Sequence, residues 1–181
     1  MPVNLFGGGA KTNVNGLHFE QETSLDTALK NAGYTVSNNG VYLGNEKVAL
    51  SVGKHDLYKR LLDPKGVDYR EYISKKLLPD EALYNLHNNT IYIIEKKFQN
   101  GAGSVDKKLQ TCDFKKKQYK KLFTPIDIEV QYFYVCNDFF KHDSYMDVFD
   151  YIRSVGCNVF FNEIPLAFLS LPKMEESAYG R

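Results

Sequence analysis

Two strand-like runs separated by a pair of asparagines constrain the fold of this chain more than any other feature. Residues 82–86 are mostly apolar, residues 90–98 are rich in β-branched and aromatic side chains, and Asn88-Asn89 lies between these two runs. Asparagine tolerates the positive φ angles of a tight hairpin turn. The sequence therefore predicts an antiparallel hairpin with a two-residue turn, in which His87 faces Thr90.

This register gathers ionisable side chains at the open end of the hairpin. Asp80 is expected opposite Lys97, and Glu95 opposite Ala82, because strand side chains alternate with period two. Glu95 then lies diagonally next to Asp80 on one face. The remaining side chains of that face are apolar: Ala82, Tyr84, Leu86, Ile91 and Ile93.

An Asp–Glu pair on an apolar face indicates a cation site. Two close carboxylates repel each other, and their burial is costly unless a positive charge intervenes. Mg²⁺ suits carboxylates, water and a substrate phosphate, and it can polarise the phosphate and generate a hydroxide. Lys97 could orient the attacking water or stabilise the transition state. The alternative is an exposed Asp80–Lys97 salt bridge with Glu95 at its rim, worth about 0.2–1 kcal/mol.

On the opposite side of the hairpin, Glu81 faces Lys96, and we expect an ordinary salt bridge there. The rest of the chain predicts an α/β fold, with no internal repeat and no linker. We therefore expect a single domain over residues 1–181, with residues 1–16 as a flexible, irregular arm. Helices are predicted at 17–32, 54–62, 68–77, 104–123 and 146–155, and strands within 34–50 and at 126–136 and 158–161.

Basic residues concentrate in the middle of the chain, although the net charge is only +1. Residues 96–121 hold nine lysines against two acidic residues, whereas residues 138–181 hold seven acidic residues against four basic ones. A basic patch of this kind attracts a polyanion. A solvated lysine face is the default alternative, but the position directly after the second strand favours phosphate contact. The candidate DNA-binding residues are Ser104, Lys107, Lys108, Lys115, Lys116 and Gln118.

Several other function classes are disfavoured. The three cysteines form no CxxC pair, and the four histidines show no metal-ligand spacing, so neither a zinc site nor a disulfide framework is indicated. No apolar run approaches the roughly 20 residues that span a bilayer. The first residues lack a signal-peptide pattern. We therefore expect a cytoplasmic protein with no membrane partner.

Pro79-Asp80, followed after an interval by Glu95-Lys96-Lys97, resembles the PD-(D/E)XK nuclease superfamily, in particular small type II restriction endonucleases. Residues 16–20 (Gly-Leu-His-Phe-Glu), 98–99 and 103–110 are also similar to family segments. The resemblance implies a restriction-endonuclease-like core, a mixed β-sheet flanked by helices. It implies these site residues: Asp80, Glu95 and the Lys96 carbonyl as metal ligands, Lys97 as catalytic lysine, Glu20 at a second ion or water, and Gln99 near the phosphate.

The implied function is Mg²⁺-dependent, sequence-specific hydrolysis of double-stranded DNA, with Mn²⁺ as an alternative ion. One active site per chain implies a homodimer or a partner subunit for a double-strand cut. The family further implies a cognate DNA methyltransferase in the same restriction system. Two alternatives stay open: a structure-specific nuclease of the same fold, such as a junction resolvase or phage repair nuclease, and a non-catalytic DNA-binding subunit.

Overall fold

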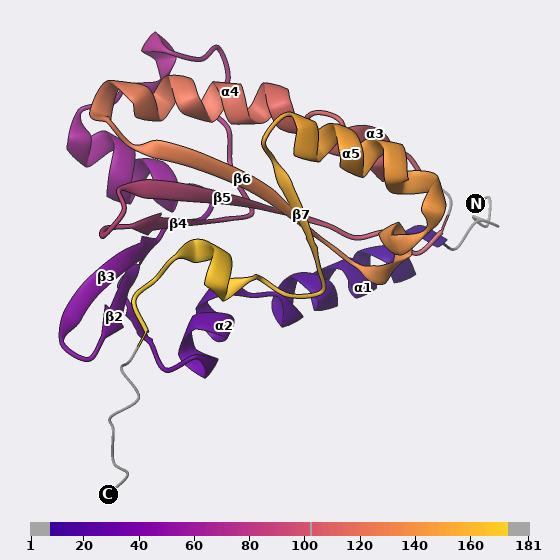
Figure 1. Ribbon diagram of the computed structural model, residues 1–181, viewed down its shortest axis with the longest axis horizontal. Coiled ribbons are helices and arrows are strands. Elements are labelled where there is room, and N and C mark those ends of the chain that lie inside the picture. The colour runs from indigo at the N-terminus through magenta and orange to yellow at the C-terminus, as the bar shows by residue number, and fades with distance from the viewer. Residues whose placement is uncertain (1–7, 102, 174–181) are drawn as a thin grey trace, which may run out of the picture.

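A seven-stranded mixed β-sheet forms the centre of the protein, as the computed structural model shows for residues 8–101 and 103–173 (Figure 1). The strands lie side by side in chain order. All pairs from β1 to β5 are antiparallel, and β5, β6 and β7 are parallel. The strands are β1 (Thr35–Ser37), β2 (Gly40–Leu43), β3 (Glu46–Ser51), β4 (Glu81–Asn85), β5 (Thr90–Lys97), β6 (Glu129–Cys136) and β7 (Asn158–Phe161).

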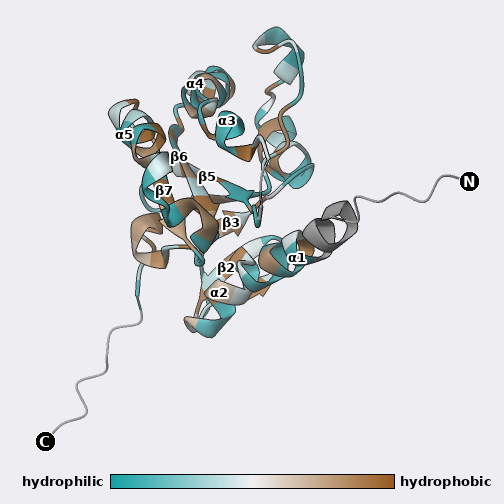
Figure 2. Ribbon diagram, turned by 90° about the vertical axis from the view of Figure 1, so that its right-hand side faces the viewer, coloured by the Kyte–Doolittle hydropathy of each residue, from teal (hydrophilic) through white to brown (hydrophobic). Residues whose placement is uncertain are grey.

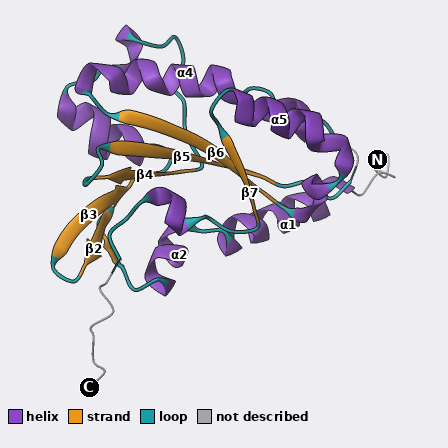
Figure 3. Cartoon of the chain, viewed as in Figure 1, coloured by secondary structure: helices purple, strands orange, loops and turns teal. Residues whose placement is uncertain are grey.

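Helices cover both faces of this sheet (Figure 3). One face carries α1 (Gly8–Glu22) and α2 (Leu25–Asn31), which pack with the segment 164–171. The other face carries α3 (Val105–Leu109), α4 (Cys112–Phe123), α5 (Met146–Ser154) and a π-helical turn, Leu57–Leu62. The fold is therefore α/β with a mixed sheet flanked by helices, as the sequence predicts.

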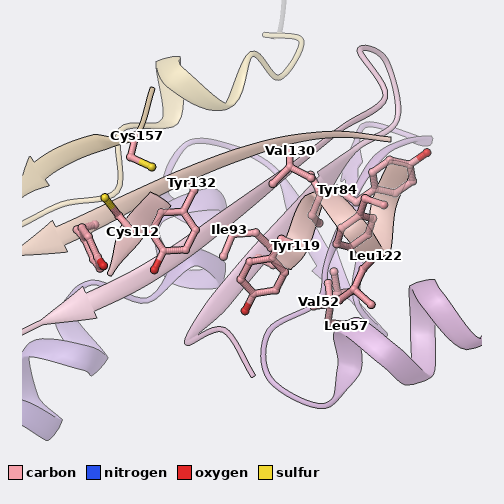
Figure 4. Close-up of a cluster of buried hydrophobic side chains, with 14 of the residues drawn as sticks. Val52, Leu57, Tyr84, Ile93, Cys112, Tyr119, Leu122, Val130, Tyr132 and Cys157 are labelled. Carbon is pink, nitrogen blue, oxygen red and sulfur yellow. The ribbon is translucent and has the colours of Figure 1, made fainter. Parts of the chain in front are cut away.

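Strand β5 contributes to the core on both sides of the sheet. Ile91 and Ile93 pack into the cluster under α4, whereas Tyr92 and Ile94 pack into the cluster over α1 and α2. Figure 4 shows Ile93 beside Tyr119 of α4 in the first of these clusters. A strand that is buried on both faces loses the simple polar–apolar alternation, but its side chains still point alternately to the two faces.

The predicted β4–β5 hairpin is present, but its register differs from the prediction. Asn85 pairs with Thr90, so residues 86–89 form a longer turn in which Asn89 has a φ of 52°. Leu86 lies in this turn with 41% of its surface exposed, and its assignment to the apolar face is wrong. The register is displaced by two residues. Because strand side chains alternate with period two, the remaining side chains all stay on their predicted faces.

The N-terminal part of the chain is more helical than predicted. Residues 8–16 belong to α1, so the prediction of an irregular arm is wrong there, and residues 1–7 lie outside the described residues. The single helix predicted for 17–32 is instead two helices. Ser24 lies between them, and its hydroxyl accepts a hydrogen bond from the Thr27 backbone N–H as the N-cap of α2.

Other element boundaries also differ. The helix predicted for 104–123 is interrupted at residues 110–111, which separate α3 from α4. The predicted helix 68–77 is reduced to a single 3₁₀ turn, Tyr69–Glu71, and the segment 34–50 forms three strands rather than two. Strand β7 has the predicted bounds. Across residues 8–101 and 103–173, the structure contains no helix long and apolar enough to cross a membrane.

Candidate active site

The predicted acidic pair and its lysine meet where the central strand β4 begins and the neighbouring strand β5 ends. Asp80 directly precedes β4, and Glu95 and Lys97 lie at the end of β5. Extending the observed register by one pair places Asp80 opposite Glu95. Both lie on the face of the sheet that also carries Ala82 and Ile93, which are fully buried. The apolar face therefore does end in an acidic pair and a lysine.

The three side chains are in ionic contact. Lys97 Nζ lies 3.0 Å from Glu95 Oε2 and 3.9 Å from Asp80 Oδ2. The backbone N–H of Lys96 donates to Asp80 Oδ2 over 2.7 Å. Asp80 keeps 32% of its side chain exposed, whereas Glu95 keeps only 8%. An exposed Asp80–Lys97 pair with Glu95 at its rim is therefore the wrong interpretation, since Glu95 is the most buried member.

A fourth ionic residue, Lys115, joins this cluster from α4. Its Nζ lies 3.3 Å from the same Glu95 Oε2. From the sequence, Lys115 is predicted to be one of the DNA-binding lysines, and its contact with Glu95 is not predicted. The available signal was its spacing, since Lys115 lies three residues after Cys112 and four before Tyr119, both buried on the stripe of α4 that faces the sheet.

Three tyrosines form the wall behind Glu95. Burial, together with the negative charge of Glu95, raises the pKa of Tyr119, Tyr132 and Tyr134 above the ordinary value for a phenol. These side chains are therefore neutral at physiological pH. Figure 4 shows Tyr119 and Tyr132 in one buried cluster with Ile93 of β5. Lys97 Nζ also lies 5.7 Å from the centre of the Tyr134 ring, within the range of a cation–π contact.

An open hollow adjoins Asp80 and Lys97 on the side of α1, and Glu95 does not line it. Its volume is about 620 Å³, large enough for a nucleotide and water. Figure 2 shows α1 and α3 on opposite sides of the sheet next to this region. Glu20 lines the hollow together with Asp80 and Lys97, so the structure brings these predicted residues together. The other lining residues are Gly16, Leu17, Phe19, Lys96, Phe98, Val105 and Lys108.

The Lys96 side chain points to the opposite face of the sheet. Its Nζ lies 3.1 Å from Glu81 Oε2 and donates to the Glu20 carbonyl over 3.0 Å, and only 5% of the side chain is exposed. Glu81 also accepts from the Leu25 backbone N–H. Burial raises the pKa of Glu81, and Lys96 opposes that shift. The predicted salt bridge is confirmed, but it is buried, and at the acidic pair Lys96 contributes its backbone.

Hydrogen bonds of Gln99 link the end of β5 to the loop after β6. Its backbone N–H donates to Asn137 Oδ1 and its carbonyl accepts from Asn137 Nδ2. The side-chain Nε2 donates to the Gly101 carbonyl over 2.6 Å. Its Oε1 is buried without a hydrogen-bond partner among the described residues. A role of Gln99 in placing a phosphate stays a prediction.

The candidate DNA-binding residues have different environments. Ser104, Lys107 and Lys108 are exposed on and just before α3, and Lys108 lines the hollow. Lys116 donates to the carbonyl of Gly156, which follows α5. Gln118 is half-buried on α4. Among the exposed candidates, Lys108 therefore shares the hollow with Asp80.

The donor set suits a hard divalent cation. Within the described ranges, 8–101 and 103–173, no group of three or more His, Cys, Asp or Glu side chains is arranged to hold a metal. Two carboxylates remain, Asp80 and Glu95, and Mg²⁺ is commonly held by one or two carboxylates with water and substrate phosphate completing the shell. Two ammonium groups already neutralise Glu95, which shows that this position requires positive charge.

No family model, curated protein or solved structure matches this chain. Its function is therefore inferred from the geometry of its own side chains.

Proposed function

We propose that this chain is a Mg²⁺-dependent DNA endonuclease with a restriction-endonuclease-like core, acting as a sequence-specific type II restriction enzyme. The observation that carries the proposal is the meeting of Asp80, Glu95 and Lys97 at the end of a buried apolar face, beside an open hollow. Charged groups at such a position are costly for stability unless they serve binding or catalysis. All three residues are also those that resemble the family motif.

The chain's own residues have distinct tasks under this proposal. Asp80 and Glu95, with the Lys96 carbonyl, hold the ion, for which Mn²⁺ can substitute. When bound, the ion polarises the scissile phosphate and lowers the pKa of a bound water. Lys97 orients that water and stabilises the charge that develops on the phosphate. The Lys96 N–H fixes the Asp80 carboxylate toward Glu95.

Binding of DNA is assigned to the exposed residues around the hollow. Lys107 and Lys108 on α3, with Ser104, contact backbone phosphates, which supply affinity but no base reading. Glu20, across the hollow, is placed to hold a second ion or a water. A double-strand cut needs two such sites, so the proposal includes a homodimer acting on a palindromic target. A cognate methyltransferase that protects the host DNA belongs to the same proposal.

One observation favours a second candidate of the same fold, a structure-specific nuclease such as a junction resolvase or repair nuclease. The hollow has an apolar wall that includes Leu17, Phe19 and Phe98, and Leu17 is 59% exposed. An apolar wall suits an unstacked base better than it suits an intact duplex. A non-catalytic DNA-binding subunit is disfavoured, because such a subunit has no need to keep Asp80, Glu95 and Lys97 in contact.

The testing experiment is digestion of unmethylated phage DNA and of a synthetic four-way junction, each with and without Mg²⁺. Discrete phage DNA bands that require Mg²⁺ support the restriction enzyme, and cutting of the junction alone supports the second candidate. Glu95→Gln removes the buried carboxylate charge, and the matched control is Glu129→Gln, since Glu129 is exposed at the start of β6, where it pairs with Thr90 at the end of β5 remote from Glu95. Absence of cutting on both substrates with Mg²⁺ or Mn²⁺ would refute the proposal.

A further inference from the structure

Glu95 is paired with two lysines through one oxygen atom. Lys97 Nζ lies 3.0 Å and Lys115 Nζ lies 3.3 Å from Glu95 Oε2. Asp80 supplies the second negative charge, 3.9 Å from Lys97. The cluster therefore contains two carboxylates and two ammonium groups and is formally neutral. A divalent cation that binds both carboxylates brings two further positive charges into this neutral cluster.

Lys115 is the lysine of the 115–117 run that enters the cluster. Lys116 donates to the Gly156 carbonyl, and Lys117 pairs with Asp113 on the exposed side of α4. Lys115 lies on the stripe of α4 that faces the sheet, and 28% of its side chain is exposed. It can therefore reach Glu95 and also keep contact with solvent.

The two lysines are held unequally. Besides Glu95, Lys97 has the Asp80 carboxylate and the face of the Tyr134 ring within interaction distance. In the part of the chain that the structure describes, Glu95 is the only acidic partner of Lys115. An added cation repels both ammonium groups. Lys115 is the more weakly held and the more exposed of the two, so it is the group that the cation displaces from Glu95.

We propose that Lys115 is an exchangeable counter-ion of Glu95, displaced by the incoming divalent cation and thereby freed to contact a phosphate of the substrate. This inference rests on the proposed function, because it takes Asp80 and Glu95 as the cation ligands. It assigns Lys115 two successive partners. Before the cation binds, its ammonium neutralises Glu95, and afterwards it is available to the polyanion.

The exchange couples cation binding to DNA binding. Without DNA, Lys115 competes with the cation for Glu95 and weakens cation binding. With DNA present, a phosphate stabilises the displaced ammonium, and the competition is relieved. Cation and DNA therefore bind more tightly together than separately, and by linkage each raises the affinity for the other by the same factor.

The test is a titration of the full chain with Mn²⁺, in which the electron paramagnetic resonance signal of the free ion measures how much Mn²⁺ is bound. Lys115→Met removes the charge but keeps an apolar stem, Lys115→Arg keeps the charge, and Lys120→Met, at an exposed position of the same helix, is the matched control. We expect Lys115→Met to bind Mn²⁺ about fivefold more tightly than wild type, the scale of losing one partly exposed competing ion pair. Lys115→Arg and Lys120→Met should stay within about twofold of wild type.

A second titration measures the coupling itself. DNA affinity is compared with and without Ca²⁺, and the increase on adding Ca²⁺ should be about fivefold smaller in Lys115→Met than in wild type. The inference is overturned if wild type binds Mn²⁺ and Lys115→Met binds it no more tightly, or if Lys115→Arg reproduces the gain. In those cases the proposed nuclease function stands. Failure of wild type and all variants to bind any divalent cation overturns the inference and the proposed function together.

Discussion

Adjacent lysines of β5 point to opposite faces of the sheet, so their removal should change different properties of the protein. Lys96 is paired with Glu81 on the face of α1, whereas Lys97 is paired with Glu95 on the face of α4. The informative change is Lys96→Met, which keeps a stem of similar length and removes the ammonium group. We expect it to lower the free energy of unfolding and to leave DNA cleavage by the folded protein in place.

The magnitude follows from what Glu81 retains in this variant. Removing one partner of a buried ion pair costs about 3–5 kcal/mol, since the other charge is left buried alone. Glu81 keeps two hydrogen bonds from the Leu25 N–H and 20% of its side-chain exposure, which reduces the expected cost to about 2–3 kcal/mol. For a chain of this length, that corresponds to a melting temperature lower by about 5–10 °C.

The effect should depend on pH in a defined direction. Burial raises the pKa of Glu81 above the ordinary value of 4.5 even with Lys96 present. Without Lys96, which opposes this shift, the pKa rises further. A carboxyl with a raised folded-state pKa stabilises the fold below its unfolded-state pKa and loses that contribution as pH rises through the folded-state pKa. The Lys96→Met variant should therefore be closer to wild type at pH 5 than at pH 7.

Urea unfolding followed by far-ultraviolet circular dichroism, at both pH values, measures this difference. Lys97→Met is the control on the opposite face, where Glu95 keeps Lys115 as a partner, and it should lose cleavage and cost less stability than Lys96→Met. The assignment of the two lysines to different faces is refuted if Lys96→Met costs less than about 1 kcal/mol at pH 7. Equal stability losses in both variants would refute it as well.

Three other predictions concern the cation ligands, the DNA surface and the buried tyrosines. Asp80→Asn and Glu95→Gln should each lower Mg²⁺-dependent cleavage by about 10²–10³-fold or more, measured on phage DNA, and rates near wild type would exclude them as ligands. Lys108→Gln should reduce the slope of log K against log salt by about 0.9, measured by fluorescence anisotropy, whereas Lys30→Gln on the exposed side of α2 should leave it unchanged. Burial raises the pKa of Tyr58 to about 12 from 10.0, so its contribution to stability is complete below pH 10 and is lost as pH rises toward 12, by about 1.4 kcal/mol per pH unit. The difference in unfolding free energy between wild type and Tyr58→Phe, measured in urea at pH 9, 10 and 11, separates this decline from that of the other buried tyrosines, and a difference that does not change with pH would contradict the burial of Tyr58.

The gathering of Asp80, Glu95 and Lys97 could be predicted although the hairpin register was wrong. The turn proved two residues longer than Asn88-Asn89 alone, and the pairing moved by two positions. Because strand side chains alternate with period two, this displacement changed the pairing partners but not the faces. The prediction depended only on the face of the sheet on which each side chain lies, and period-two alternation gives that face even when the pairing partners are wrong.

Other features depend on tertiary contacts that sequence patterns do not carry. Residues 8–16 contain several glycines and asparagines, which have low helix propensity, yet they are part of α1. Further along this helix, Phe19 is buried and packs its ring 5.7 Å from that of Phe98. The contact of Lys115 with Glu95 depends on the break between α3 and α4 at residues 110–111, which sets the rotation of α4.

The position of the candidate site follows from unequal strand lengths. Strand β4 begins at Glu81, two residues after Pro79, which has no N–H to donate to a ladder. Strand β5 continues to Lys97, and its last residues, 95–97, pair with β6 alone. In this region the Lys96 N–H donates to the Asp80 carboxylate. A side-chain oxygen therefore accepts the hydrogen bond that a backbone carbonyl of a neighbouring strand would otherwise accept. The end of β5 is thus open on the side of β4 and supported by β6 on the other, which gives charged side chains a rigid base and access to solvent.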